Sequence, residues 1–141
     1  MRVSSKARYG LAVMVTLAKQ PENTVSVMTL SQELGLSKIY LEQVLNPLKT
    51  NGLVLATKGA QGGYRLVDEK ITVKQVLQTL EPAFFEITSE SCEDPTLNRV
   101  IKQQVYDRMQ EGFEGSYMDL TLRQLAKKSK EAQQESLMFY I

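Results

Sequence analysis

The first pattern along the chain is amphipathic and lies between Ser4 and Lys19. Apolar residues recur there at intervals of three and four positions, which places them on one face of an α-helix. Ser4 or Ser5 stands at the start of this pattern and can cap the helix through its hydroxyl group. The sequence therefore predicts a helix over 4–19 with an apolar face of Ala7, Leu11, Met14, Val15 and Ala18.

A second periodic segment is interrupted by a tight turn. Thr29–Leu34 is predicted as a short helix, and Gly35 follows it at a position where a positive φ would end the helix. Ser37 can cap the next helix, which is predicted to end at Asn51. Two helices joined by so short a turn indicate a helix-turn-helix.

A glycine-rich hairpin is predicted directly after the second helix. Leu53–Thr57 and Tyr64–Leu66 have the character of strands, and Lys58–Gly63 is the turn between them. Val25–Val27 is predicted as a short strand that pairs with this hairpin. Helix, turn, helix and hairpin form a winged helix-turn-helix, whose second helix enters the major groove of DNA.

The second helix has two different faces. Its buried stripe is predicted to contain Leu41, Val44, Leu45 and Leu48, with either Ile39 or Tyr40 beside them. Its opposite face can hydrogen-bond or pair with charge, and consists of Lys38, Glu42, Gln43, Asn46 and Lys49.

The remainder of the chain is predicted as further helices. Thr72 caps a helix that runs to Leu80, and residues 83–88 are expected to be a strand or an extended loop. A long helix is expected over 96–111, ended by Gly112 and Gly115. Thr121 is expected to cap a last helix, with 127–135 charged and mobile before an apolar terminus that packs on another surface.

The long helix at 96–111 has an apolar stripe that lacks an obvious partner. One interpretation is dimerisation, because proteins that read DNA with one helix per subunit commonly pair to match a two-fold site. The other is packing within the chain, on the first helix and on the helix at 72–80, and the two interpretations are compatible. The fold class is thus mainly α, with a winged helix-turn-helix domain at 1–81 and a dimerisation region at 82–141 that pairs through Leu97, Val100, Ile101 and Val105.

Composition narrows the class of protein. No run of about 18 apolar residues is present, so no membrane is expected as a partner. The single cysteine excludes an intramolecular disulfide and suits the cytoplasm, and the absence of histidine removes the commonest general base and metal ligand. No catalytic constellation is recognisable, so an enzyme is not expected.

Charge is divided unevenly along the chain. Residues 1–80 contain ten Lys and Arg against five Asp and Glu, whereas residues 81–141 contain seven against eleven. A basic first part is what phosphate binding requires. Because it coincides with the helix-turn-helix pattern, it favours a nucleic-acid partner over an accidental division of surface charge.

Several motifs, in this order, resemble one family. They are Arg2-Val3-Ser4-Ser5-Lys6-Ala7-Arg8-Tyr9-Gly10, then 40–48, Asn51-Gly52-Leu53-Val54, Lys58-Gly59-Ala60-Gln61-Gly62-Gly63-Tyr64, and 71–81. Together they resemble the Rrf2 family of bacterial transcription regulators, which contains iron-sulfur and cysteine-metabolism regulators. The resemblance covers nearly all of residues 1–81 and is looser beyond them.

The resemblance implies which residues contact DNA. On the second helix these are Ile39, Tyr40, Glu42 and Gln43, beside Lys38 of its polar face, and on the hairpin they are Lys58, Gly59, Gly62 and Gly63. Gln43 can pair with adenine, and glycines allow the hairpin to approach phosphate. Tyr40 is either a DNA contact or a core residue. Lys58 stands where the family often has arginine, so it keeps the charge without the bidentate geometry.

Members of the family that bind an iron-sulfur cluster carry three cysteines in the loop and the start of the long helix. In this chain Cys92 fits the first of these positions, but Asn98 and Gln104 occupy the other two. One thiolate cannot supply the ligands that a cluster needs. No metal or other cofactor is therefore expected, and a packed or solvent-facing thiol is favoured over a redox role for Cys92, which has carboxylates beside it.

The function that these patterns favour is a sequence-specific, DNA-binding transcription regulator. The resemblance implies a homodimer and, most commonly, repression of transcription. Expected partners are double-stranded DNA, a second copy of the chain, and a small-molecule or protein effector. The alternative is a winged-helix module that binds other proteins, which would need an apolar patch in place of the polar face at Lys38, Glu42 and Gln43.

Overall fold

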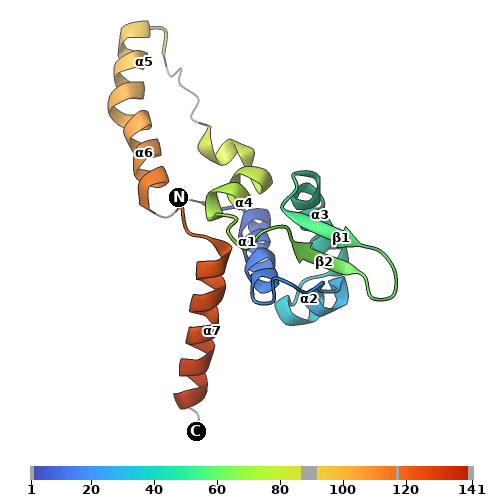
Figure 1. The fold of residues 1–141 in the computed structure, drawn as a ribbon. Coiled ribbons are helices and arrows are strands. Elements are labelled where there is room, and N and C mark those ends of the chain that lie inside the picture. The colour runs from blue at the N-terminus through green and yellow to red at the C-terminus, as the bar shows by residue number, and fades with distance from the viewer. Residues whose placement is uncertain (1, 87–91, 117, 140–141) are drawn as a thin grey trace.

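The computed structural model describes residues 2–86, 92–116 and 118–139. Its first part is a winged helix-turn-helix (Figure 1), formed by α1 (Ser5–Ala18), α2 (Val27–Leu34), α3 (Lys38–Thr50) and the antiparallel hairpin of β1 (Val54–Thr57) and β2 (Gly63–Leu66). The mainly helical fold with a small hairpin is confirmed.

Helix starts follow the hydroxyl caps. Ser4, Ser37 and Thr72 each accept a hydrogen bond from a backbone N–H in the first turn of α1, α3 and α4 (Val73–Leu80). At Thr72 the side chain of Gln75 also accepts from the Thr72 N–H, at 2.9 Å, which completes a capping box. These short-range signals are the reason that the predicted starts of the three helices agree with the structure.

The predicted strand at Val25–Val27 is wrong in extent. Only Val25 pairs with the hairpin, through reciprocal backbone hydrogen bonds of 2.8 Å with Tyr64. Ser26 then caps α2, which begins at Val27, two residues before the predicted start. Because the Ser26 hydroxyl satisfies an N–H of the first helical turn, the chain leaves the extended conformation there.

The core is shared between sequence-distant helices. Buried side chains of α1, α3 and α4 pack with the hairpin, and α7 (Leu122–Phe139) adds Leu122 and Ala126 to the same cluster. Backbone bonds from Val73 to Leu120 and from Leu122 to Ile71, both 2.8 Å, anchor the start of α7 beside α4. The first turns of α7 therefore belong to the core of the winged helix.

The long helix extends further than predicted. Helix α5 (Pro95–Ile101), the π-helical turn η2 (Lys102–Tyr106) and α6 (Asp107–Ser116) follow one another without a break, and we call this continuous helix the arm. Gly112 and Gly115 do not end it, because neither adopts a positive φ. A glycine within a helix costs only about 1 kcal/mol relative to alanine, which the flanking turns tolerate.

Two other expectations are corrected. The predicted strand or extended loop at 83–88 begins as the 3₁₀ helix η1 (Pro82–Phe85), because Pro82 suits a first helical position; residues 87 and 88 lie outside the described residues. The charged segment 127–135 belongs to α7, since Lys, Glu, Gln and Ala are good helix formers.

The distal half of α7 projects away from the core (Figure 1). Leu137 and Met138 are exposed, Met138 by 77%, so the apolar end does not pack on the described part of the chain. Tyr140 and Ile141 lie outside the described residues. Among the helices that the structure describes, none combines the length and apolar character that crossing a bilayer demands.

Candidate nucleic-acid interface

The turn between α2 and α3 fixes the direction of the second helix. Gly35 has a φ of 65°, and a side chain there would be strained. The Ser31 hydroxyl donates to the Leu36 carbonyl at 2.6 Å, and the Ser37 hydroxyl accepts from the Tyr40 N–H at 3.1 Å. Both predictions for this turn, at Gly35 and Ser37, are confirmed, and the turn holds α3 by hydrogen bonds at either side.

Helix α3 has one buried and one exposed face, as its pattern predicts. Leu41, Val44, Leu45 and Leu48 are completely buried in the core. The exposed face carries the predicted contact residues Lys38, Ile39, Glu42 and Gln43, together with Asn46 and Lys49. Ile39 is 72% exposed, so the apolar position next to the stripe belongs to Tyr40. The structure thus brings the predicted side chains of this helix together on one accessible surface.

Tyr40 is half-buried and packs against the core at the edge of the exposed face. Its ring meets that of Tyr9 from α1 edge-on, with centroids 5.6 Å apart and planes at 89°. The core interpretation of Tyr40 is therefore observed in part, and its contact with DNA stays a prediction. The pairing with Tyr9 was missed by sequence reasoning, because nothing local links two residues 31 positions apart.

Packing within the fold explains why two positions of the wing, 62 and 63, are glycine. A Cβ on Gly62 would overlap the Thr57 carbonyl oxygen, and one on Gly63 would overlap the Val25 carbonyl oxygen. Gly59 differs, because it has a φ of 108° and open space around it. Close approach to phosphate is thus not needed to explain Gly62 and Gly63, whereas the exposed Lys58 and Gly59 form the accessible turn of the wing.

The electrostatics of the two parts of the chain differ. Within the described residues, every cation in an ion pair lies at or after Lys74: the four are Lys74, Lys102, Arg123 and Lys128. No described carboxylate lies within 4.0 Å of the charged groups of Lys38, Lys49 or Lys58. The cations beside the exposed face of α3 and on the wing are therefore free to bind phosphate.

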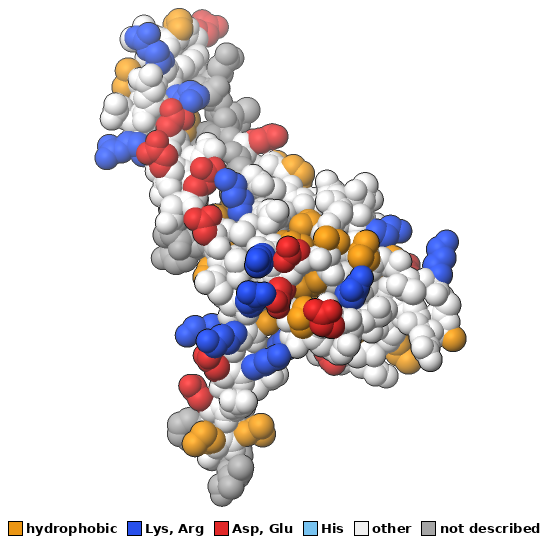
Figure 2. Space-filling view, in the orientation of Figure 1, with side chains coloured by type: hydrophobic (Ala, Val, Ile, Leu, Met, Phe, Trp, Pro, Cys, Tyr) orange, Lys and Arg blue, Asp and Glu red, His pale blue; other side chains and the backbone are white. Residues whose placement is uncertain are grey.

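The arm has no buried residue in α5 or η2. The predicted dimerisation residues Leu97, Val100 and Val105 are 44–47% exposed, and Ile101 is half-buried. Figure 2 shows Lys, Arg, Asp and Glu side chains mixed along one face of the arm. Among the described residues, packing of this stripe on α1 and α4, the alternative interpretation, is not observed; α7 packs against α1 instead.

In the part of the chain that the structure describes, the arm meets the core at the end of α6. Phe113 packs against Phe84 with ring centroids 6.4 Å apart, and Lys74 Nζ lies 3.3 Å from Glu114 Oε1. The pKa of the Glu114 carboxyl is lowered, first by the hydrogen bond from Gln110 and then by Lys74.

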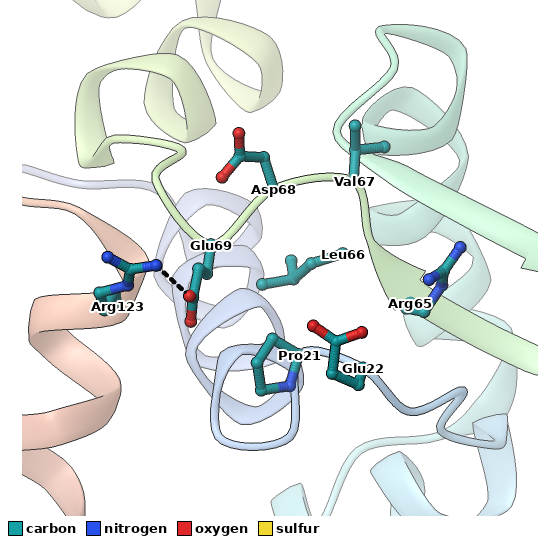
Figure 3. A pocket seen from close by; sticks show the side chains of 8 residues that line it. All are labelled: Pro21, Glu22, Arg65, Leu66, Val67, Asp68, Glu69 and Arg123. Carbon is teal, nitrogen blue, oxygen red and sulfur yellow. Dashed lines mark hydrogen bonds and ion pairs between the residues drawn. The ribbon is translucent and has the colours of Figure 1, made fainter.

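A shallow pocket lies at the base of the wing (Figure 3). Glu69 and Arg123 form an ion pair that joins α7 to the segment leaving β2, and Glu22 lies nearby on the loop after α1. The carboxylate of Glu69 raises the pKa of Arg123. This polar junction ties α7 to the wing segment but lies apart from the exposed face of α3.

Comparison with known proteins places the chain. A model of the Rrf2 family, described as iron-dependent transcriptional regulator, matches residues 3–128. The HTH-type transcriptional regulator CymR of Bacillus subtilis is 35% identical over 144 positions, covering 100% of both chains. The chain belongs to the Rrf2 family.

Solved Rrf2 structures have the same architecture. The structure of CymR (YrzC), the global cysteine regulator of B. subtilis, has a TM-score of 0.76 at 33% identity and covers 91% of this chain and 98% of that one. IscR of T. potens has a TM-score of 0.73 at 32% identity, with 94% and 91% covered. The resemblance that the motifs predicted is confirmed, and the relatives compared are transcription regulators.

The iron in the Rrf2 description is not matched by the ligands of this chain. Cys92 is exposed, and its neighbour at the second ligand position is Asn98, whose Nδ2 donates to the Cys92 carbonyl at 2.6 Å. The third position is the exposed Gln104. Two carboxamides and one thiol do not fit an iron-sulfur cluster, which is held by thiolates. This chain is an Rrf2 member without the cluster cysteines.

Proposed function

We propose that the protein is a sequence-specific DNA-binding transcription regulator, a repressor that acts in the cytoplasm as a homodimer on a two-fold operator. The observation that carries the proposal is the exposed face of α3. It presents Glu42 and Gln43, which can read base edges, between cations that have no described carboxylate partner.

Each part of the chain has a separate role in this proposal. Residues 1–81 form the DNA-binding domain, with Lys38, Ile39, Tyr40, Glu42 and Gln43 at the major groove and Lys58, Gly59, Gly62 and Gly63 of the wing at the backbone. Residues 82–141 supply the arm, and its stripe of Leu97, Val100, Ile101 and Val105 pairs two subunits. A small-molecule or protein effector then shifts the affinity for the operator.

The function of the relatives supports this proposal over an interaction module. CymR and IscR are HTH-type transcriptional regulators, and the helix-turn-helix of this chain presents the polar exposed face of α3. A module that bound proteins through α3 would bury an apolar patch there. On the exposed face of α3 only Ile39 is apolar.

Selection from random duplex DNA tests the proposal. The purified protein should enrich one sequence whose two halves are related by a two-fold axis, with centres about 10 base pairs apart or a multiple of that. The selected duplex should then bind roughly a thousandfold or more tightly than a scrambled one at physiological salt. Equal affinity for the two duplexes would refute sequence-specific binding, and an enriched site without symmetry would refute the two-fold operator.

A further inference from the structure

The second turn of α1 lies against the first turn of α3. Tyr9 is exposed by 39%, yet its ring meets Tyr40 edge-on. The neighbouring Gly10 lies in the core beside this contact. An added Cβ at Gly10 would make an ordinary van der Waals contact with Val44 Cγ1 on α3, at 3.5 Å, but would overlap the Leu80 side chain on α4. Gly10 therefore permits the close packing of α1 on α4, while the Tyr9–Tyr40 pair marks the contact of α1 with α3.

Arg8 is held on the same exposed edge of α1. Its guanidinium carbon is 5.9 Å from the centroid of the Tyr9 ring, and its Nη2 donates to the Ser5 hydroxyl at 3.1 Å. No described carboxylate is close enough to form an ion pair with it. A guanidinium has five N–H donors, so most of those on Arg8 remain available for a ligand.

We propose that this edge of α1 is a phosphate-binding part of the DNA interface, in which Arg8 contacts the backbone and Tyr9 positions Tyr40. The inference rests on the proposed function and adds two residues that the family motifs did not assign to DNA. Tyr40 stands at the start of α3, where the recognition helix enters the groove. Arg8 lies against the Tyr9 ring, which in turn contacts Tyr40, so its guanidinium would be available to a DNA backbone that passes the start of α3.

The chemistry separates the roles of the two side chains. A guanidinium binds two phosphate oxygens at once but carries no sequence information, so Arg8 adds affinity that is independent of sequence and sensitive to salt. Tyr9 acts through Tyr40. An edge-to-face pair restrains the Tyr40 ring, and with it the start of the surface that reads bases.

The experiment titrates variants against the selected operator and a scrambled duplex at several salt concentrations. Arg8→Gln should weaken both duplexes by the same factor and reduce the slope of log affinity against log salt by about 0.9 per subunit. Lys127→Gln is the matched control, because it removes one exposed cation from α7, which lies on the other side of α1 from α3 in Figure 1. Its slope should equal that of the unsubstituted protein.

Tyr9 is tested by a pair of substitutions. Tyr9→Leu should lower the ratio of specific to scrambled affinity by about two- to tenfold, which is what losing an edge-to-face pair can supply. Tyr9→Phe keeps the ring and should restore the ratio. If Tyr9→Leu does not fold by circular dichroism, Tyr9→Phe and Arg8→Gln still carry the test, because both change only polar groups on the surface.

The possible outcomes separate failure of this inference from failure of the proposed DNA-binding function. If the unsubstituted protein prefers its operator but Arg8→Gln leaves the salt slope unchanged, Arg8 does not bind phosphate. The proposed function still stands in that case. If Tyr9→Phe loses as much discrimination as Tyr9→Leu, Tyr9 does not act by positioning the ring. If the unsubstituted protein does not discriminate between the duplexes, both proposals fall.

Discussion

The winged helix and the arm are both amphipathic, but they use their apolar residues differently. In α3, four apolar side chains are completely buried within the chain. In α5 and η2, none is buried, although apolar residues recur there as regularly. The same kind of sequence pattern therefore has two outcomes, which depend on whether a complementary surface exists in the same chain.

This difference indicates what each region needs. The winged helix completes its core from its own residues and from the first turns of α7. Among the described residues, the arm meets that core near Phe113 and Glu114, while Leu97, Val100 and Val105 stay exposed. A soluble monomer rarely leaves a continuous apolar stripe in water. The proposed pairing of two arms would bury this stripe, and the predictions below test that difference between the two regions.

The largest expected effect follows from placing a charge in the arm stripe. Val100→Glu should convert a dimer of about 32 kDa, twice the chain mass of 15.9 kDa, to a monomer at micromolar concentration. A carboxylate buried in an interface without a partner costs at least about 3 kcal/mol, or roughly a hundredfold in dissociation constant. Sedimentation velocity measures the mass.

The control for this substitution adds the same charge to a polar position. Gln103→Glu adds the charge at a polar position outside the apolar stripe, three residues further along the arm, and should leave the dimer intact. Thermal unfolding of Val100→Glu should retain the transition of the winged helix. An unchanged mass for Val100→Glu would mean that the arm stripe is not the dimer contact.

A second test makes the same change, glycine to alanine, separately in each region. Gly10→Ala should reduce the free energy of unfolding by about 1–3 kcal/mol, because the new methyl group overlaps the buried Leu80 and the tightly packed core must shift. An added Cβ on Gly112 of the arm would lie more than 4 Å from the described side chains of other segments, so Gly112→Ala should stabilise the helix by about 0.5–1 kcal/mol. Urea unfolding of the two variants measures the opposite signs.

The arm glycine also sharpens the position of the interface. If Gly112→Ala weakens dimerisation instead, then Gly112 lies where two arms approach closely, and the interface extends to the end of α6. If Gly10→Ala is neutral, the core can accommodate the added methyl group at no cost, and α1 is not packed tightly on α4 at that position.

The winged helix and the arm also differ in how well the sequence predicts their helices. Starts of helices with a local cap, at Ser37 and Thr72, follow from hydrogen bonds within three residues, which a sequence displays directly. The helix at 127–135 and the uninterrupted passage of the arm through Gly112 were missed, because a charged or glycine-containing segment can be helical when its neighbours are.

The contacts that position the candidate site could not be predicted, because they join residues that are not neighbours in the sequence. The Tyr9–Tyr40 pair and the contact of Gly63 with Val25 join residues far apart in the sequence. The residues on the exposed face of α3 were predictable, because helical periodicity alone separates that face from the core. Their surroundings on α1 and under the wing were not, because those depend on how the elements pack.

The third prediction separates reading from positioning on the winged helix. Gln43→Ala should weaken operator binding by roughly 1–3 kcal/mol and relax preference at particular base pairs, since Gln43 can pair with adenine. Lys58→Ala should weaken all duplexes similarly and reduce the salt slope by about 0.9 per subunit. Glu42→Ala should accept more sites, if its carboxylate rejects sequences that lack a hydrogen-bond donor.

Titration of these variants against the operator and a scrambled duplex measures both quantities. The mass of each variant should remain that of a dimer, because the arm is unaltered. If Gln43→Ala keeps the full ratio of specific to scrambled affinity, α3 is not the reading helix. A dimer lost in Gln43→Ala would show that the two regions do not act separately.

The smallest expected effect concerns the junction of the two regions, where Glu114 of the arm meets Lys74 of α4. Its carboxyl has a lowered pKa, first because Gln110 donates to it and then because of Lys74. The folded state thus favours the ionised form, and the resulting stability is present above the unfolded pKa of a glutamate, about 4.3. It is lost as the pH falls through the lower folded value. Because both side chains are partly exposed, the effect is small and is screened by salt.

Urea unfolding as a function of pH, at low salt, tests this junction. At a pH above the unfolded pKa of glutamate, the unsubstituted protein should be slightly more stable than Glu114→Gln. The two curves of unfolding free energy against pH should converge as acid protonates the carboxyl. Glu111→Gln removes a carboxylate of the same helix that is not ion-paired with a described residue, so it should show no such convergence. Parallel curves for Glu114→Gln and the unsubstituted protein would mean that the arm does not rest on α4 in solution. The position of the arm would then depend on the proposed dimer contact and not on α4, so the winged helix and the arm would be independent of each other within one subunit.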